Sequence, residues 1–171
     1  VSFPLGVHPV GQVFARVAQE RGLGVNWAGS GASTPSVAQV QLLEYLKPRY
    51  WLGMSSYGIH LANLATEQGI DLANGSVERI LCSAEPLSTA KREKIERMWG
   101  AQVFDGFGMT EAGMMGCESS ARDGFHIWTD LFYIEVLDPQ SLQPMAEGEV
   151  GTLVVTPLWT NNATPFLRWS S

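Results

Sequence analysis

The sequence has little cysteine, few basic residues and no long apolar run. Two cysteines, Cys82 and Cys117, among 171 residues are too few for a disulfide scaffold, so we expect a reducing, cytoplasmic compartment. Eleven Lys and Arg stand against 17 Asp and Glu, and the net charge of −6 argues against a nucleic-acid or anionic-membrane partner. No apolar run approaches the roughly 18 residues of a membrane-spanning helix. We therefore expect no nucleic-acid and no membrane partner.

The sequence also lacks an initiator Met and a polar tail. It opens inside the apolar stretch VSFPLGV and stops in TPFLRWSS, an apolar and aromatic run with the pattern of a strand. Natural termini usually fray at the surface. We therefore expect an internal piece of a larger protein. Apolar strands near both ends would favour association between copies, so a homodimer is a further expectation.

Up to about residue 105, helical and strand patterns alternate. Thr34 and Ser88 are typical helix N-caps, and Gly22 is a typical C-cap. Helices are expected over 10–21, 35–46, 57–69 and 88–99, and strands over 23–29, 49–55, 77–83 and 101–104. The expected buried face of the second helix consists of Val37, Val40, Leu43 and Leu46. This alternation predicts a parallel sheet with helices on both faces.

From residue 119 onward the sequence predicts strands and no helix. The stretches FHIWTDLFYIEVLDP and GEVGTLVVTPL are rich in β-branched and aromatic residues, and the turn-rich DPQSLQPMAEGE lies between them. The predicted fold class is therefore α/β. It combines a parallel-sheet subdomain over residues 1–118 with an antiparallel β subdomain, barrel-like or sandwich-like, over residues 119–171.

Two strand ends are followed by unusual loops, CSAEPLS and DGFGMTE. In parallel α/β sheets, ligands lie beyond the carboxyl ends of the strands. Gly106 and Gly108 would let the backbone approach a flat ligand and would permit positive φ angles, and Phe107 between them offers a ring for stacking. The alternative is a glycine-rich turn with a buried Phe, because short glycine motifs occur in many unrelated structures.

Polar residues flank the aromatic ring in an order that suits a nucleotide. Asp105 can accept a hydrogen bond from an exocyclic amine, and Thr110 and Glu111 can address a phosphate and its Mg²⁺. In the alternative interpretation, Glu111 is a solvated surface carboxylate. A Rossmann dehydrogenase would need a glycine-rich turn after its first strand, and NWAGSGAST is a poor match to that turn.

The motifs FDGFGMTE and SAEP together resemble the adenylate-forming superfamily, which includes acyl- and aryl-coenzyme A ligases and peptide-synthetase adenylation domains. The resemblance is closest to the phenylacetate–coenzyme A ligases. In these, the aromatic-Gly-x-Ser/Thr-Glu motif is followed by a Glu-Cys pair, then GLHIWED, then a strand that ends in Asp-Pro. This sequence has Cys117-Glu118, then GFHIWTDLFYIEVLDP, so the resemblance covers nearly the whole chain in the same order.

The resemblance implies roles for single residues. The backbone of the SAEP loop would lie along one face of the adenine, and this loop consists of Ser83, Ala84, Glu85 and Pro86. Phe107 stands where the family usually has Tyr and would stack on the other face, with Gly106 and Gly108 beside it. Asp105 would accept from the adenine amine. Thr110 would contact the α-phosphate, and Glu111 would be the Mg²⁺ ligand.

Further residues are candidates for a substrate pocket or a structural metal. The stretch FPLGVHPVG resembles the family motif beside the acyl pocket, which makes His8 a candidate there, although a surface His at a helix entry fits equally. Trp27 and Tyr57 would face the same pocket or belong to the core. Cys117 and His126 have residue types that bind zinc, but two ligands do not make a tetrahedral site. The alternative is a small buried Cys and a hydrogen-bonded strand His.

The resemblance implies an ATP-dependent acid–coenzyme A ligase. Such an enzyme uses ATP and Mg²⁺ to adenylate a carboxylic acid, here an aromatic, phenylacetate-like acid, and passes the acyl group to coenzyme A. Two alternatives are an adenylation domain that feeds a carrier protein and a degenerate nucleotide-binding module without catalysis. The family's phosphate loop would precede Val1, and its ribose-binding Asp and catalytic Lys would follow Ser171. The ending WSS departs from the family's usual YRT.

Overall fold

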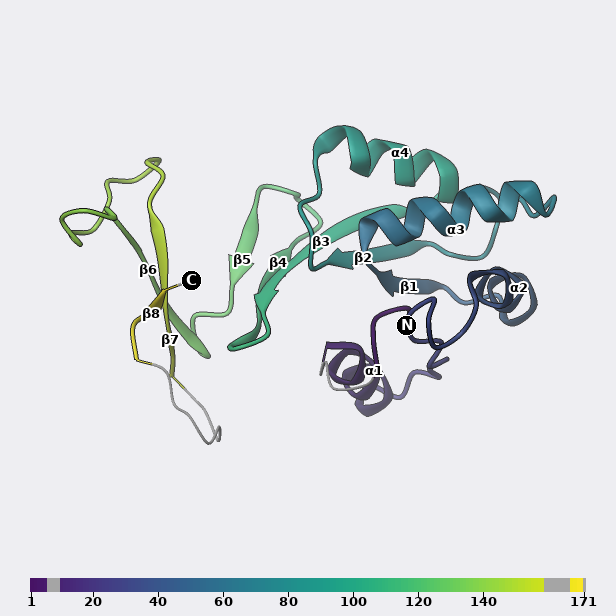
Figure 1. Cartoon of the computed structure of the whole chain (residues 1–171), viewed down its shortest axis with the longest axis horizontal. Helices are drawn as coiled ribbons and strands as arrows, with labels where there is room; N and C mark the ends of the chain where they lie inside the picture. Colours follow the sequence, from purple (N-terminus) through teal and green to yellow (C-terminus); the bar gives the residue numbers. More distant parts are fainter. Residues whose placement is uncertain (6–9, 159–166, 171) are drawn as a thin grey trace.

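The computed structural model describes residues 1–5, 10–158 and 167–170, which form helices and two sheets (Figure 1). The helices of this part are α1 (Val10–Glu20), α2 (Ser36–Leu46), α3 (Ser55–Glu67) and α4 (Thr89–Trp99). The strands are β1 (Tyr50–Gly53), β2 (Arg79–Ser83), β3 (Gln102–Met109), β4 (Gly113–Glu118), β5 (Phe125–Ile127), β6 (Phe132–Leu137), β7 (Thr152–Pro157) and β8 (Trp169–Ser170). None of the described helices is long and apolar enough to cross a membrane.

The first sheet is mixed, with the strand order β1-β2-β3-β4-β5. Strands β1, β2 and β3 are parallel, whereas β4 is antiparallel to β3 and β5 is antiparallel to β4. The α/β class is confirmed, but the sheet is not purely parallel. The reason is the connection between β3 and β4, which is only the turn at residues 110–112. A parallel neighbour needs a crossover of about a dozen residues or more.

Helices α3 and α4 pack on one face of the parallel strands and form the main core with them (Figure 1). Trp51, Ile80 and Val103 are neighbours on β1, β2 and β3 and belong to this core. Each is at most 3% exposed. The Trp99 indole nitrogen donates to the Gly58 carbonyl oxygen at 3.0 Å, and the Trp99 ring centroid lies 5.2 Å from that of Trp51. Ser88 caps α4 as expected, because its hydroxyl accepts from the Lys91 backbone nitrogen.

The opposite face of the sheet is only partly covered by described residues. Helix α1 lies on this side, so helices do flank both faces (Figure 1). A hollow of about 990 Å³ nevertheless remains between α1, α2 and the sheet. Its lining includes Phe14, Val17, Leu46, Leu81 and Phe104.

Three local expectations in the first 50 residues differ from the structure. Residues 23–29 form no strand: Gly29 has a φ of 73°, and single backbone hydrogen bonds rather than a ladder join this segment to Val1. Helix α2 has Pro35 rather than Thr34 as its N-cap residue, and no side chain caps it. On the expected buried face of α2, Val40 is fully buried, but Val37 and Leu46 are 45% and 48% exposed.

The stretch FHIWTDLFYIEVLDP, for which the sequence predicts strand structure, divides between the two sheets. Strand β5 pairs with β4, while β6 opens a separate antiparallel sheet of order β6-β7-β8. A turn at 128–131 separates them, with the Phe132 nitrogen donating to the Trp128 carbonyl oxygen. The change of sheet therefore comes after Ile127, later than the change of pattern at residue 118. Two subdomains with a boundary at 118 stay a prediction.

The second sheet packs against the β3–β4 hairpin. Met115, Phe132 and Val155 form a small buried cluster there, and Phe107 and Met109 of β3 pack onto it. The hairpin that carries the DGFGMTE motif is therefore held between the main core on one side and the second sheet on the other.

Candidate functional site

The two motif-bearing segments meet at the carboxyl ends of β2 and β3. Ser83, the last residue of β2, stands opposite Gly106 of β3. Its hydroxyl donates to the Gly106 carbonyl oxygen at 2.8 Å, and Ser83 is 4% exposed. Beyond Gly106, β3 continues to Met109 without β2 beside it. The second half of the motif therefore extends past the parallel edge of the sheet, where ligands bind in α/β folds.

The motif itself is mostly strand, not the loop that the sequence suggested. Strand β3 runs through Asp105–Met109 and pairs with β4, with a register shift between Phe107 and Gly108. Gly106 and Gly108 do not have positive φ angles, so that expectation is wrong. Glycine is needed for a close approach instead. A Cβ at Gly108 would lie 2.5 Å from the Gly113 carbonyl oxygen.

The left-handed backbone of the site lies in the SAEP loop and in the hairpin turn. Ala84 has a φ of 72°, which is uncommon for a residue with a side chain, and Gly113 at the end of the turn has a φ of 87°. Thr110 and Glu111 lie in this turn and are exposed. The predicted phosphate and Mg²⁺ contacts are thus at the tip of a short hairpin, open to solvent.

The position of Phe107 is compatible with both interpretations of the sequence, a ring that stacks on a ligand and a buried core residue. Its ring is half-buried against the Met115 cluster, and its centroid lies 5.4 Å from that of Phe125 on β5. The ring is therefore braced by the core while part of its surface stays accessible. Stacking on a base stays a prediction for this residue.

Glu85 turns its side chain away from the loop and toward helix α3. Its carboxylate accepts from the Ser55 hydroxyl at 2.9 Å and from the Ser56 backbone nitrogen, and Lys91 lies 3.8 Å away. Burial alone would raise the pKa of Glu85, but the hydrogen bonds from Ser56 and Ser55 and the charge of Lys91 lower it overall. An anion at a helix N-terminus is favourable, and Met54 supplies no side-chain cap there. Glu85 thus anchors the loop to helix α3, while Ala84 and Pro86 on either side of it are exposed.

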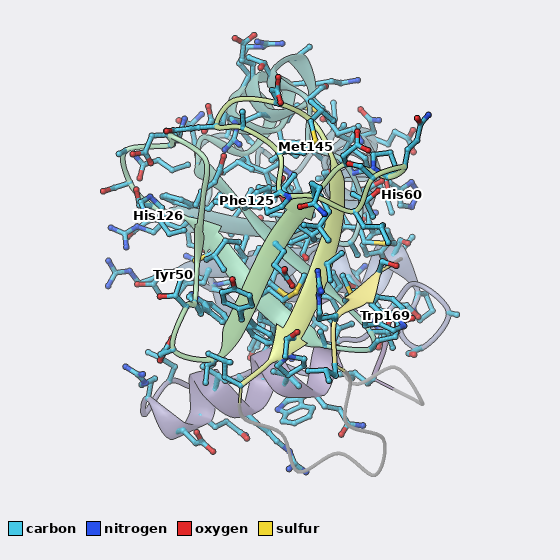
Figure 2. All side chains as sticks on the ribbon, turned by 90° about the vertical axis from the view of Figure 1, so that its left-hand side faces the viewer. Tyr50, His60, Phe125, His126, Met145 and Trp169 are labelled. Atoms are coloured by element: carbon cyan, nitrogen blue, oxygen red, sulfur yellow. The ribbon has the colours of Figure 1, made fainter. Side chains whose placement is uncertain are left out.

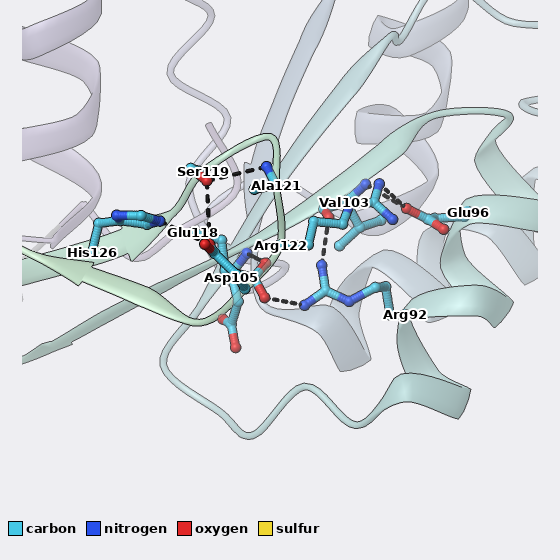
Figure 3. A network of polar contacts seen from close by, with 10 residues as sticks. Arg92, Glu96, Val103, Asp105, Glu118, Ser119, Ala121, Arg122 and His126 are labelled. Carbon is cyan, nitrogen blue, oxygen red and sulfur yellow. Dashed lines mark hydrogen bonds and ion pairs between the residues drawn. The ribbon is translucent and has the colours of Figure 1, made fainter. Parts of the chain in front are cut away.

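Asp105 lies beside a second carboxylate. Its backbone nitrogen donates to Glu118 Oε2 at 2.8 Å, and Glu118 Oε1 accepts from Arg92 at 2.6 Å (Figure 3). Burial, followed by the charge of Glu118, raises the pKa of Asp105 to about 6, although a backbone hydrogen bond from Gly106 and the charge of Arg92 work against this shift. The roles of Arg92 and Glu118 were missed in the sequence, where Glu118 stood out only as part of the Cys-Glu pair.

The substrate-pocket role of His8, Trp27 and Tyr57 stays a prediction. His8 lies outside the described residues. Trp27 is 39% exposed and lies on no strand. The Tyr57 hydroxyl lies 3.0 Å from the Ser36 hydroxyl, and its ring stacks on His60. Tyr57 also packs against the main core. Its core interpretation is supported, and neither aromatic lines the large hollow.

The zinc interpretation of Cys117 and His126 gains no support. The two residues are direct partners on β4 and β5, but the His126 ring nitrogen lies 2.9 Å from Asp123. Figure 2 shows His126 at the outer side of the molecule. Among the described residues, no three His, Cys, Asp or Glu side chains are grouped so that they can hold a metal ion. The interpretation of His126 as a hydrogen-bonded strand residue fits this geometry.

Comparison with known proteins identifies what this arrangement is similar to. The family model described as AMP-binding enzyme matches residues 19–158. The phenylacetate-coenzyme A ligase of Thermus thermophilus is 34% identical over 134 residues, which are 77% of this chain and 30% of that protein. The enzyme of the same name from Escherichia coli is 33% identical over 144 residues, which are 82% of this chain and 32% of that protein.

A solved structure resembles the whole fold. An open conformation of 2-hydroxyisobutyryl-CoA ligase in complex with 2-HIB-AMP and CoA superposes with a TM-score of 0.86 at 29% identity, covering 92% of this chain and 38% of that one. The chain thus spans about a third of the length of the curated relatives it matches.

Proposed function

Because this chain belongs to the AMP-binding enzyme family, we propose that the protein containing it joins a carboxylic acid to coenzyme A through an acyl-adenylate. The observation that carries the proposal is the meeting of the SAEP loop and the β3–β4 hairpin, joined by the 2.8 Å bond from Ser83 to Gly106. The curated relatives bear the name phenylacetate-coenzyme A ligase, which supports this reaction and favours an aromatic acid as the substrate.

The adenine of ATP would lie between the SAEP loop and Phe107. The exposed residues Ala84 and Pro86 offer a surface for one face of a flat base, because Glu85 between them is turned toward α3. Phe107 would stack on the other face, and the Asp105 carboxylate would accept from the exocyclic amine. The rigid contact between β2 and β3 would set the spacing of these groups.

Thr110 and Glu111 would face the phosphates from the hairpin turn. The Thr110 hydroxyl can donate to the α-phosphate. Glu111 offers one exposed carboxylate, which fits a Mg²⁺ ion held mainly by phosphate oxygens and water. A Mg²⁺ ion bound with ATP would supply positive charge beside the phosphates, and Glu111 would help to hold it. Attack of the substrate carboxylate on the α-phosphorus would form the acyl phosphate bond and release pyrophosphate, and fixed donors such as Thr110 favour such a step.

A pyrophosphate-release screen of the full-length protein tests this proposal. Phenylacetate, benzoate, a straight-chain acid and a branched hydroxy acid would be compared, each with ATP and Mg²⁺ and with or without coenzyme A. We expect release with an aryl acid and a thioester product when coenzyme A is present. Adenylate without a thioester would point to a carrier-protein acceptor, and no release with any acid would contradict the ligase proposal.

A further inference from the structure

Along the first part of β3, charged side chains rather than a neighbouring strand form the hydrogen bonds to the backbone on one edge. Strand β4 pairs with β3 only from Gly106 onward, so the backbone of Val103 and Asp105 is open on that side. Glu96 accepts from the Val103 nitrogen at 3.0 Å, and Arg92 donates to the Val103 carbonyl oxygen at 2.6 Å. Glu118 accepts from the Asp105 nitrogen at 2.8 Å. Figure 3 shows these groups side by side along the strand.

Arg92 and Glu118 form the buried part of this arrangement. Their side chains are 15% and 11% exposed, and each also holds a backbone group of β3. The ion pair thereby joins helix α4 to β4. It does so beside Asp105, the first residue of the DGFGMTE motif in β3. A buried ion pair of this kind is weak evidence for stability, since desolvation offsets most of its attraction. Its hydrogen bonds instead hold the backbone of β3 in place, Arg92 at Val103 and Glu118 at Asp105.

The charged and titratable groups around Asp105 come from three elements. Glu118 on β4 and Arg92 on α4 act on it with opposite signs, and Cys82 is its partner on β2. Burial, followed by the charges of Asp105 and Glu85, raises the pKa of the Cys82 thiol to about 12, so this neighbour is uncharged near neutral pH. Glu96, paired with Arg122 at 2.7 Å, lies farther along the edge at Val103.

We propose that Arg92 and Glu118 are positioning residues for nucleotide recognition, which fix the β3 edge at Asp105 and jointly set the charge of its carboxylate. The inference rests on the proposed function, because Asp105 matters here as the acceptor for the adenine amine. An ionised carboxylate is a stronger acceptor than a neutral one. ATP affinity should therefore fall about fivefold to tenfold when Asp105 is protonated.

The test is ATP binding to the full-length protein, measured by calorimetry between pH 5 and pH 8 without any acid substrate. In the unmodified protein the affinity should fall through a midpoint near the pKa of Asp105, which is about 6. Glu118→Gln removes the neighbouring negative charge and should move the midpoint to lower pH. Arg92→Gln removes the positive charge and should move it to higher pH. Ionisation of ATP itself is common to all variants and cancels in their comparison.

Two controls separate this role from a merely structural one. Glu96→Gln alters the same strand edge at Val103 and should leave the midpoint unchanged. Arg92→Lys keeps the charge and should restore the midpoint near its original pH. Opposite shifts for Glu118→Gln and Arg92→Gln support the proposal. Equal loss of affinity at every pH in both variants, or shifts in the same direction, would overturn it.

The outcomes also distinguish this inference from the ligase proposal. Opposite pH shifts without pyrophosphate release in the acid screen would sustain the positioning role and contradict the ligase. Pyrophosphate release without opposite shifts would support the ligase proposal and contradict the positioning role of Arg92 and Glu118. A full-length protein that binds no ATP would contradict both.

Discussion

The carboxyl group of Asp105 has a different pKa in the fold than in an unfolded chain. Burial and the Glu118 charge raise its folded-state pKa to about 6, from an ordinary value of 3.8. Its neutral form is therefore favoured by folding. The resulting stabilisation is fully present below about pH 4 and is lost as the pH rises through about 6. At neutral pH the ionised carboxylate therefore costs stability relative to its neutral form.

We expect Asp105→Asn to raise the free energy of unfolding of the 171-residue chain at pH 8 by about 1 kcal/mol. The full linkage value is larger, but solvent screens this partly exposed group. At pH 4 the difference should nearly vanish, because Asp105 is then neutral in the folded state. Urea denaturation followed by tryptophan fluorescence measures both values. An equal gain at the two pH values would show that charge is not the cause.

Glu111 is exposed at the hairpin tip, so its replacement should leave the fold intact. In the full-length protein, Glu111→Gln should lower the rate of pyrophosphate release by at least about tenfold, because it removes the proposed carboxylate ligand of Mg²⁺. The thermal midpoint should change by no more than that of an ordinary surface variant. Glu149→Gln, an exposed carboxylate on the loop before β7, is the matched control. Normal release by Glu111→Gln would remove Glu111 from the site.

The β3–β4 hairpin places the motif by close backbone packing. Met109 and Gly113 end its ladder, and a bulge lies between Phe107 and Gly108. A bulge re-aims side chains and is common beside functional sites. In this hairpin Gly108 permits the two strands to approach, and the bulge lies just before the turn that carries Thr110 and Glu111.

Replacement of Gly108 by Ala should destabilise the chain by about 1–3 kcal/mol. The added Cβ would lie 2.5 Å from the Gly113 carbonyl oxygen and 2.8 Å from the Met114 Cα, and backbone cannot yield as a flexible side chain can. Gly24→Ala is the control, because its Cβ would meet nothing within 4 Å. Equal urea midpoints for the two variants would mean that the strands separate at little cost.

At the scale of the whole molecule, the two segments proposed to contact adenine meet at one edge of the first sheet. These segments are residues 83–86, after β2, and residues 105–111, in β3 and the turn that follows it. The 171 residues also expose the apolar hollow on the α1 side of the sheet. Both features bear on how the isolated chain behaves.

The isolated chain should bind ATP no more tightly than the millimolar range and should show no ligase activity. Stacking on one ring supplies about 1–3 kcal/mol, while immobilising a ligand costs at least several kcal/mol. Calorimetry of the 171-residue chain with ATP and Mg²⁺ measures this directly. Micromolar affinity would show that the recognition energy lies in these two segments alone.

The hollow should also lead to association between copies of the isolated chain, because contiguous apolar surface of this kind favours contact. Leu46 is 48% exposed and lines the hollow, so Leu46→Lys should lower the associated fraction in sedimentation experiments. Leu142→Lys is the control, since Leu142 is 65% exposed and is not part of the lining. Equal association of both variants would place the contact elsewhere.

Elements with local signals were predictable. Helix α4 begins after Ser88 and ends at Gly100, whose φ of 62° is a left-handed cap, and both signals lie within a few residues of the helix. The SAEP and DGFGMTE segments were also placed together correctly, because parallel strands end at one edge of a sheet. These features depend on sequence spacing of a few residues or on a general rule of topology.

Strand pairing and side-chain contacts depended on residues far apart in the chain. The extension of β3 through its motif requires β4 as a partner, and the assignment of β5 and β6 to different sheets follows from which edge each one meets. Arg92 and Glu118 are 26 residues apart in sequence, and their contact exists only because β4 returns beside β3 near α4. A hydrogen bond or ion pair of this kind leaves no periodic trace in the sequence, because both of its partners are positioned by packing elsewhere in the molecule.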